Sequence, residues 1–95
     1  MNAFINSIAV GTTAVEILSN DETRTSIIFS PPAANRVTIS DSASVSDGNG
    51  IVLYALEMPL QINYDDFGSW VCKPLYAISN AGTNTIGILA STGGE

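Results

Sequence analysis

Apolar and polar residues alternate along short segments of this chain, a pattern typical of half-buried β-strands. In the segment TSIIF, Ile27 and Phe29 fall on one side, and in NRVTIS the pair Val37 and Ile39 does the same. The apolar period is two residues, and no segment shows the 3.6-residue spacing of a helix longer than about one turn. The segments predicted as strands are TTAVEIL, TSIIF, NRVTIS, GIVLYAL, MPLQINY, WVCKPLYAIS and TNTIGILAS.

Turn residues separate these segments, so that the strands recur at intervals of about ten to fifteen residues, as in antiparallel sandwiches. Pro31 and Pro32 end the second predicted strand, and Pro59 places the fifth at an edge or a bulge. We therefore predict an all-β protein: a single antiparallel β-sandwich of about seven strands, jelly-roll or immunoglobulin-like. The residues predicted to lie largely inside it are Val15, Ile17, Ile27, Phe29, Val37, Ile39, Leu53, Leu60, Ile62, Tyr76 and Ile88.

The chain has 95 residues, which is enough for one domain with a modest core. We assign residues 12–90 to the sandwich. Residues 1–11 are apolar without strong alternation, and we predict that they form an extended N-terminal arm that lies on a neighbouring subunit. Residues 91–95 are predicted to be a polar C-terminal tail.

The charge of the chain argues against several classes of partner. Its net charge is −6, and its cations are Arg24, Arg36 and Lys73, so we do not expect nucleic acid as a partner. We expect Arg24 to pair with Asp21 or Glu22 and so to close the first turn. No stretch approaches the roughly 20 apolar residues of a membrane span, and the first residues lack the basic start of a secretion signal. A soluble protein made in the cytoplasm, with no membrane partner, is therefore expected.

Catalytic and metal-binding groups are scarce. The chain contains no histidine, so it lacks the commonest general base and metal ligand, and we expect neither an enzyme nor a cofactor. The segment VSDGNGIVL has the residue order of a calcium loop. With Gly50 at position 6 of such a twelve-residue loop, Val45 and Leu56 occupy positions 1 and 12, where oxygen ligands are needed, and only Asp47 and Asn49 remain. We interpret the segment as a polar turn and expect no metal site.

Most of the chain follows one order of strands and turns. Between Val15 and Leu89, an opening strand leads through an Asn-containing turn and an Arg to TSIIF. An RVTIS strand, a Gly-rich loop, a GIVL strand and a closing hairpin from LYAIS to TIGIL follow. In this order the chain resembles the small all-β virion proteins of tailed bacteriophages, and within them it points most naturally to the capsid decoration, or cement, proteins. The resemblance rests on strand order and loosely spaced residues, and no functional residue is carried over from it.

The resemblance implies a structural protein that binds the major capsid protein on the outer surface of the virion, as a small homo-oligomer with a trimer favoured. A charge of −6 agrees with a place outside the shell, because it repels packaged DNA. A neck, tail or fibre-base component and, less favoured, a carbohydrate-binding sandwich remain open. From the residues themselves, we expect partner contacts from the arm and from the loops SPPAA and DDFGSW, at Met1, Ala3, Phe4, Ile5, Ile8, Pro31, Pro32, Phe67 and Trp70.

Overall fold

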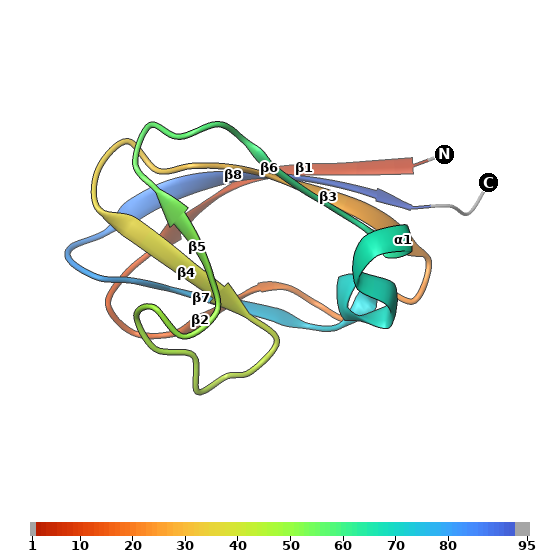
Figure 1. Cartoon of the computed structure of the whole chain (residues 1–95), viewed down its shortest axis with the longest axis horizontal. Helices are drawn as coiled ribbons and strands as arrows, with labels where there is room; N and C mark the ends of the chain where they lie inside the picture. The colour runs from red at the N-terminus through yellow and green to blue at the C-terminus, as the bar shows by residue number, and fades with distance from the viewer. Residues whose placement is uncertain (1, 93–95) are drawn as a thin grey trace.

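The computed structural model describes residues 2–92, and for residues 2–5 the description is limited to the backbone. Two four-stranded antiparallel sheets make up most of it, and the seven segments predicted as strands contribute β2 to β8 (Figure 1). The chain is therefore β-rich, as predicted. In chain order the elements are β1 (Asn2–Val10), β2 (Val15–Leu18), β3 (Arg24–Ser30), β4 (Arg36–Ser40), β5 (Ile51–Tyr54), β6 (Leu60–Asn63), α1 (Tyr64–Phe67), the 3-10 helix η1 (Gly68–Cys72), β7 (Leu75–Ser79) and β8 (Asn84–Thr92).

The strands pair in a nested order. One sheet has the order β1-β8-β3-β6 and the other has the order β2-β7-β4-β5. Strands equally far from the two ends of the series are neighbours: β1 pairs with β8, β2 with β7, β3 with β6, and β4 with β5. Two further pairings, β3 with β8 and β4 with β7, complete the sheets. The first and last strands therefore lie side by side, although they are far apart in the sequence (Figure 1).

Residues 2–10 form β1, and the extended N-terminal arm predicted for this segment is not what the structure shows. The strand is antiparallel to β8 along its whole length, with Asn2 opposite Thr92 and Val10 opposite Asn84. Backbone hydrogen bonding to β8 does not need strict alternation of side chains, which is why the sequence pattern missed this strand. At the other end of the chain, β8 runs as far as Thr92 and so includes the start of the segment predicted as a tail.

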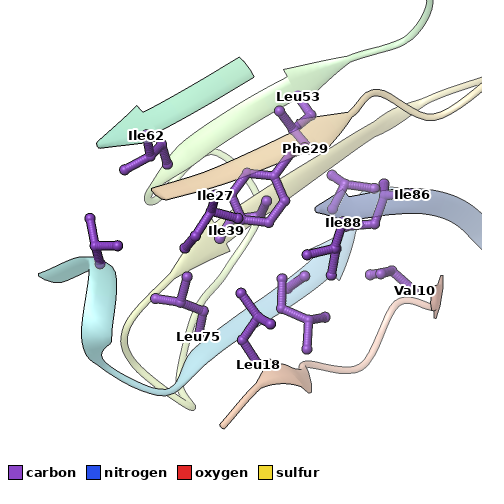
Figure 2. Close-up of a cluster of buried hydrophobic side chains, with 14 residues drawn as sticks. Val10, Leu18, Ile27, Phe29, Ile39, Leu53, Ile62, Leu75, Ile86 and Ile88 are labelled. Atoms are coloured by element: carbon purple, nitrogen blue, oxygen red, sulfur yellow. The ribbon is translucent and has the colours of Figure 1, made fainter. Parts of the chain in front are cut away.

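One hydrophobic core lies between the two sheets (Figure 2). Ile27 and Phe29 of β3 are fully buried, and Ile39 of β4 and Leu53 of β5 come from the opposite sheet. Because the alternating residues of each strand point to the same face of its sheet, the inner faces of both sheets supply this core. The core also includes Val10, Ile17, Leu18, Val37, Ile62, Val71, Leu75, Ala77, Ile86 and Ile88.

Three residues predicted to lie inside are not fully buried. Val15 is exposed, while Leu60 and Tyr76 are half-buried. The register of β2 shifts between Glu16 and Leu18, and this irregularity lets the adjacent residues Ile17 and Leu18 both reach the core. Val15 lies opposite the buried Ala77 but begins an edge strand, where burial is incomplete. Tyr76 lies on the outer face of β7, because its neighbours on either side point inward. Leu60 begins an edge strand, where burial is incomplete.

The segment DDFGSW, predicted as a loop, lies within α1 and η1, which close one end of the molecule (Figure 1). Helix η1 buries Val71 and Cys72. The predicted strand WVCKPLYAIS is correspondingly shorter, because its first residues are helical and β7 begins only at Leu75, directly after Pro74. The segment thus caps the core instead of extending a sheet.

Candidate interaction surface

Three large apolar side chains are exposed where β5 leads into β6. The exposed fractions are 55% for Tyr54, 82% for Leu56 and 85% for Met58. Single exposed apolar residues are ordinary, but several that lie close together form the kind of patch that marks a contact site. The connection between β5 and β6 is therefore the first part of a candidate interaction surface.

Hydrogen bonds hold the backbone of this connection against the β3–β4 connection. The amide of Ala55 donates to the carbonyl of Asn35 at 3.1 Å, and the amide of Leu56 donates to the carbonyl of Pro32, also at 3.1 Å. Leu56 has a φ of 61°, in the left-handed region that costs a leucine about 1–2 kcal/mol. Since the hydrogen bonds maintain this conformation, the exposed side chain of Leu56 is held at a defined position.

A groove lies beside this connection, between the edge strands of the two sheets. β5 is an edge strand of one sheet and β6 is an edge strand of the other. The groove therefore opens on the side of the molecule that these two edge strands form. Glu57 is the one ionisable carboxylate in its lining. The lining is otherwise mainly apolar and consists of Pro31, Ile51, Val52, Leu53, Tyr54, Leu56, Glu57, Met58, Pro59 and Leu60.

A second apolar feature continues the same surface toward the helical end. The rings of Phe67 and Trp70 are 6.0 Å apart at an angle of 42°, and Phe67 is 45% exposed. These two rings and Ile51 line another hollow, together with Gly50 and other residues. Ile51 lines both hollows, so the two hollows adjoin at the start of β5. We call the apolar surface around them the β5–β6 surface and define it by Ile51, Tyr54, Leu56, Met58, Phe67 and Trp70.

Arg24 fixes the position of the helix that carries Trp70. Its guanidinium donates from Nε to the carbonyl of Val71 at 2.7 Å, from Nη1 to that of Ser19 at 3.0 Å, and from Nη2 to that of Lys73 at 2.8 Å. Arg24 is 4% exposed, and this burial lowers the pKa of its guanidinium from the usual value without removing its charge. The expected pairing with an acidic residue of the turn is thus replaced by three carbonyls. The clamp joins the β2–β3 turn to η1 and to the start of β7.

Asp21, the expected partner of Arg24, instead organises the turn itself. Its carboxylate accepts hydrogen bonds from the amide of Thr23 at 3.0 Å and from the Thr23 hydroxyl at 2.7 Å. These two bonds favour the ionised form, so the pKa of Asp21 is lowered from its ordinary value, and the nearby charge of Arg24 adds to the effect. The carboxylate of Asp21 and the guanidinium of Arg24 therefore interact through their charges and do not form a direct ion pair.

The segment with the residue order of a calcium loop packs against β4. Both carboxylate oxygens of Asp47 are held by Arg36, at 2.9 Å from Nε and 2.6 Å from Nη2, and this lowers the pKa of Asp47. The amide of Gly48 donates to the Thr38 hydroxyl at 3.0 Å. At Gly50, an added Cβ would lie 2.5 Å from the carbonyl oxygen of Ile39, so glycine is required there. Among residues 2–92, no group of three or more His, Cys, Asp or Glu is placed to hold a metal ion.

The sequence-predicted contact residues of the first segment belong to β1. Met1 lies outside the described residues. The backbones of Ala3, Phe4 and Ile5 pair with β8, and their side chains also lie outside the description. Ile8 is half-buried and packs against the core of its own chain. The structure therefore does not leave this segment as a free arm.

The predicted loop residues have different outcomes. Phe67 is exposed, and Trp70 is half-buried with part of its surface packed against the core, so both belong to the β5–β6 surface. Pro31 is half-buried and lines the groove beside the β5–β6 connection. Pro32 is fully buried, which corrects its assignment as a surface anchor. The carbonyl of Pro32 accepts the hydrogen bond that the amide of Leu56 donates.

Sequence reasoning missed the most exposed members of the surface, Tyr54, Leu56 and Met58. Met58 falls in the segment MPLQINY, which is predicted as a strand, but β6 begins only at Leu60. The available signal was Pro59 together with an apolar run, GIVLYAL, that has no polar face. A run apolar on both faces indicates either two buried faces or one exposed contact face, and the sequence does not distinguish them.

The described part of the chain contains no helix of the length and apolarity that a membrane crossing requires. No protein-family model, curated protein or solved structure matches this chain.

Proposed function

We propose that this chain is a structural virion protein that binds the outside of a bacteriophage head and reinforces the shell of major capsid protein. The observation that carries the proposal is the β5–β6 surface, an apolar patch on a backbone held by hydrogen bonds. The sequence resemblance supplies the kind of partner, and the surface supplies a place for it to bind. A decoration protein needs such a contact and needs no catalytic group.

The energetics of the β5–β6 surface support a contact role. Leu56 and Met58 are almost as exposed as in an unfolded chain, so covering them would contribute about 25 cal/mol for each Å² of apolar area removed from water. A loop already held in one conformation loses little entropy on binding. Many copies of such a modest contact, each bridging adjacent capsid subunits, would stabilise a shell through their combined occupancy.

The topology also supports the proposal. Nested pairing of first with last strand, second with seventh, third with sixth and fourth with fifth is the order of a jelly roll, one of the two sandwich types expected from the sequence. We propose this assignment for the present fold. Jelly rolls occur in viral capsid domains but also in lectins and enzymes, so the topology agrees with a virion role without requiring it.

The charge distribution favours the outer side of the shell. Arg24 donates to three carbonyls, Arg36 is paired with Asp47, and Lys73 lies 3.5 Å from Asp41. Within residues 2–92 every cation is therefore already engaged, in a chain whose net charge is −6. A surface of this kind repels DNA, which is packed inside the head.

The test is reconstitution on stripped particles. Leu56→Ser and Met58→Ser together should reduce the number of copies bound per head, and should lower the temperature of DNA release toward that of undecorated particles. Val15→Ser is the matched control, because Val15 is an exposed apolar residue on β2, at the edge of its sheet opposite β5.

Three outcomes would contradict the proposal. Equal DNA release temperatures with and without the wild-type protein would refute reinforcement. Labelling confined to tails would assign the chain to the neck, tail or fibre base. Equal occupancy of the double variant and of Val15→Ser would show that the β5–β6 surface does not make the contact.

A further inference from the structure

β1 is an edge strand with unusual properties for an exposed edge. It pairs with β8 on one side, and no described strand pairs with its other side. It is 9 residues long and contains no charged residue, no proline and no glycine. A long apolar edge is a template for pairing with another strand, and proteins normally protect such edges.

The other three edges are protected in the ordinary ways. β6 has 4 residues and directly follows Pro59, which has no amide hydrogen. β2 also has 4 residues, carries Glu16 and is irregular between Glu16 and Leu18. β5 has 4 residues and leads into the bent connection at Leu56. The contrast singles out β1 as the edge left open to a partner strand.

Charge favours a second copy of this chain at that edge. Two copies would each bring a net charge of −6, so they can meet closely only where acidic residues are absent. β1 and the neighbouring β8 contain no charged residue at all. Asn6, Ser7 and Ala9 of β1 are exposed, which leaves this part of the strand accessible.

We propose that two copies of this chain pair through β1, antiparallel across a two-fold axis at Asn6, so that their sheets join into one continuous eight-stranded sheet. A two-fold pairing matches residue i of one copy with residue 12 − i of the other when Asn6 is its centre. Because Asn6 is the middle residue of Asn2–Val10, this register is the one that pairs all 9 residues of both strands. It places Ala3 opposite Ala9 and Phe4 opposite Ile8, while Asn2 lies opposite Val10 and Ile5 opposite Ser7, so no like charges meet across the pair.

The geometry favours this dimer over the trimer expected from the sequence resemblance. A closed trimer needs a head-to-tail contact, in which β1 of one copy meets a different edge of the next. The edges at β2, β5 and β6 have 4 residues each, so they would cover less than half of β1. Self-pairing covers the whole strand.

Single cysteines test the register on the free protein, independently of any capsid. In Asn6→Cys the two new thiols face each other, with Cα atoms about 4.5–5.5 Å apart, which is within disulfide range. In Ala9→Cys the two new cysteines lie six positions apart along the paired strands, a separation of roughly 20 Å. The native Cys72 is buried and is also present in both variants. Oxidation of the wild-type chain therefore shows how much crosslinking Cys72 contributes.

We expect wild-type protein to have twice its 9.9 kDa monomer mass by light scattering. Under mild oxidation Asn6→Cys should give a covalent dimer, while Ala9→Cys should stay uncrosslinked like the wild type. A wild-type mass that remains at one chain up to millimolar concentration would overturn the proposal. Crosslinking of Ala9→Cys as fast as that of Asn6→Cys would overturn the register and with it the β1 pairing.

Discussion

Arg24 shows how a single residue can organise a loop-rich end of a small β-protein. Its side chain is buried without a carboxylate in direct contact, and its three hydrogen bonds go to carbonyl oxygens from two other segments of the chain. A buried guanidinium is tolerated when its donors are satisfied, since each charged hydrogen bond contributes about 1.5–3 kcal/mol. The residue thus acts as a clamp on η1.

Replacing Arg24 should therefore destabilise the fold, and lysine should not rescue it. An ammonium group is compact and cannot present the fork of Nε, Nη1 and Nη2 to three separate carbonyls. We expect Arg24→Lys to lower the free energy of unfolding by roughly 3 kcal/mol, measured by urea denaturation. Arg36→Lys is the control, because Arg36 lies in an exposed ion pair, and it should leave the midpoint nearly unchanged. Equal midpoints for the two variants would contradict the clamp.

At the scale of elements, the β5–β6 connection combines backbone strain with apolar exposure. Leu56 has a positive φ, and its side chain is 82% exposed. Both features oppose the stability of an isolated chain, and sites that carry such costs often have a function. The hydrogen bonds to Asn35 and Pro32 keep the connection in place. The backbone conformation of Leu56 therefore affects the stability of the fold, whereas its exposed side chain is available for contact with a partner.

Two substitutions at Leu56 distinguish these effects. Leu56→Gly should be more stable than Leu56→Ala by about 1 kcal/mol, because glycine adopts positive φ without strain and alanine does not. Both variants lose the exposed side chain, so both should occupy fewer sites on stripped heads than the wild type does. Urea denaturation gives the first result, and copy counting by mass spectrometry gives the second. A glycine variant no more stable than the alanine variant would show that the backbone at Leu56 is not strained.

At the scale of the whole molecule, the nested pairing makes the two ends of the chain depend on each other. β1 is bonded to β8, which also pairs with β3, so strands from distant parts of the chain lie side by side in one sheet. Val10 at the end of β1 is fully buried in the common core. Removing one end should therefore affect the entire fold.

Deleting residues 1–8 tests this dependence. The deletion removes most of β1, so it removes the hydrogen bonds to β8 and the packing of Ile8 against the core. With about 0.5–1.5 kcal/mol for each net backbone hydrogen bond, a loss of at least ~3 kcal/mol in unfolding free energy is expected. Asn6→Ser keeps the strand and changes one exposed side chain, so it should denature like the wild type. A truncated chain as stable as the full-length chain would indicate a free arm after all.

Several features follow from the sequence alone. The strand class, the approximate positions of β2 to β8 and the inward side of β3 and β4 depend on side-chain alternation, which is a local property. For the same reason the residues on the inner faces of these strands, such as Ile27, Phe29, Val37 and Ile39, were predicted correctly. The structure leaves Phe67 exposed and places Pro31 in the lining of the groove, and their role as partner contacts stays a prediction.

The tertiary structure decided what depends on distant partners. β1 is a strand because its backbone pairs with that of β8, and no local pattern in residues 2–10 encodes this pairing. Pro32 is buried and Leu56 is exposed because of hydrogen bonds and packing between the β3–β4 and β5–β6 connections. Arg24 donates hydrogen bonds to the carbonyls of Val71 and Lys73, far along the chain, and not to the nearby Asp21. Periodicity records which way a side chain points, whereas strand pairing and burial at the ends of a sheet depend on which segments meet in space.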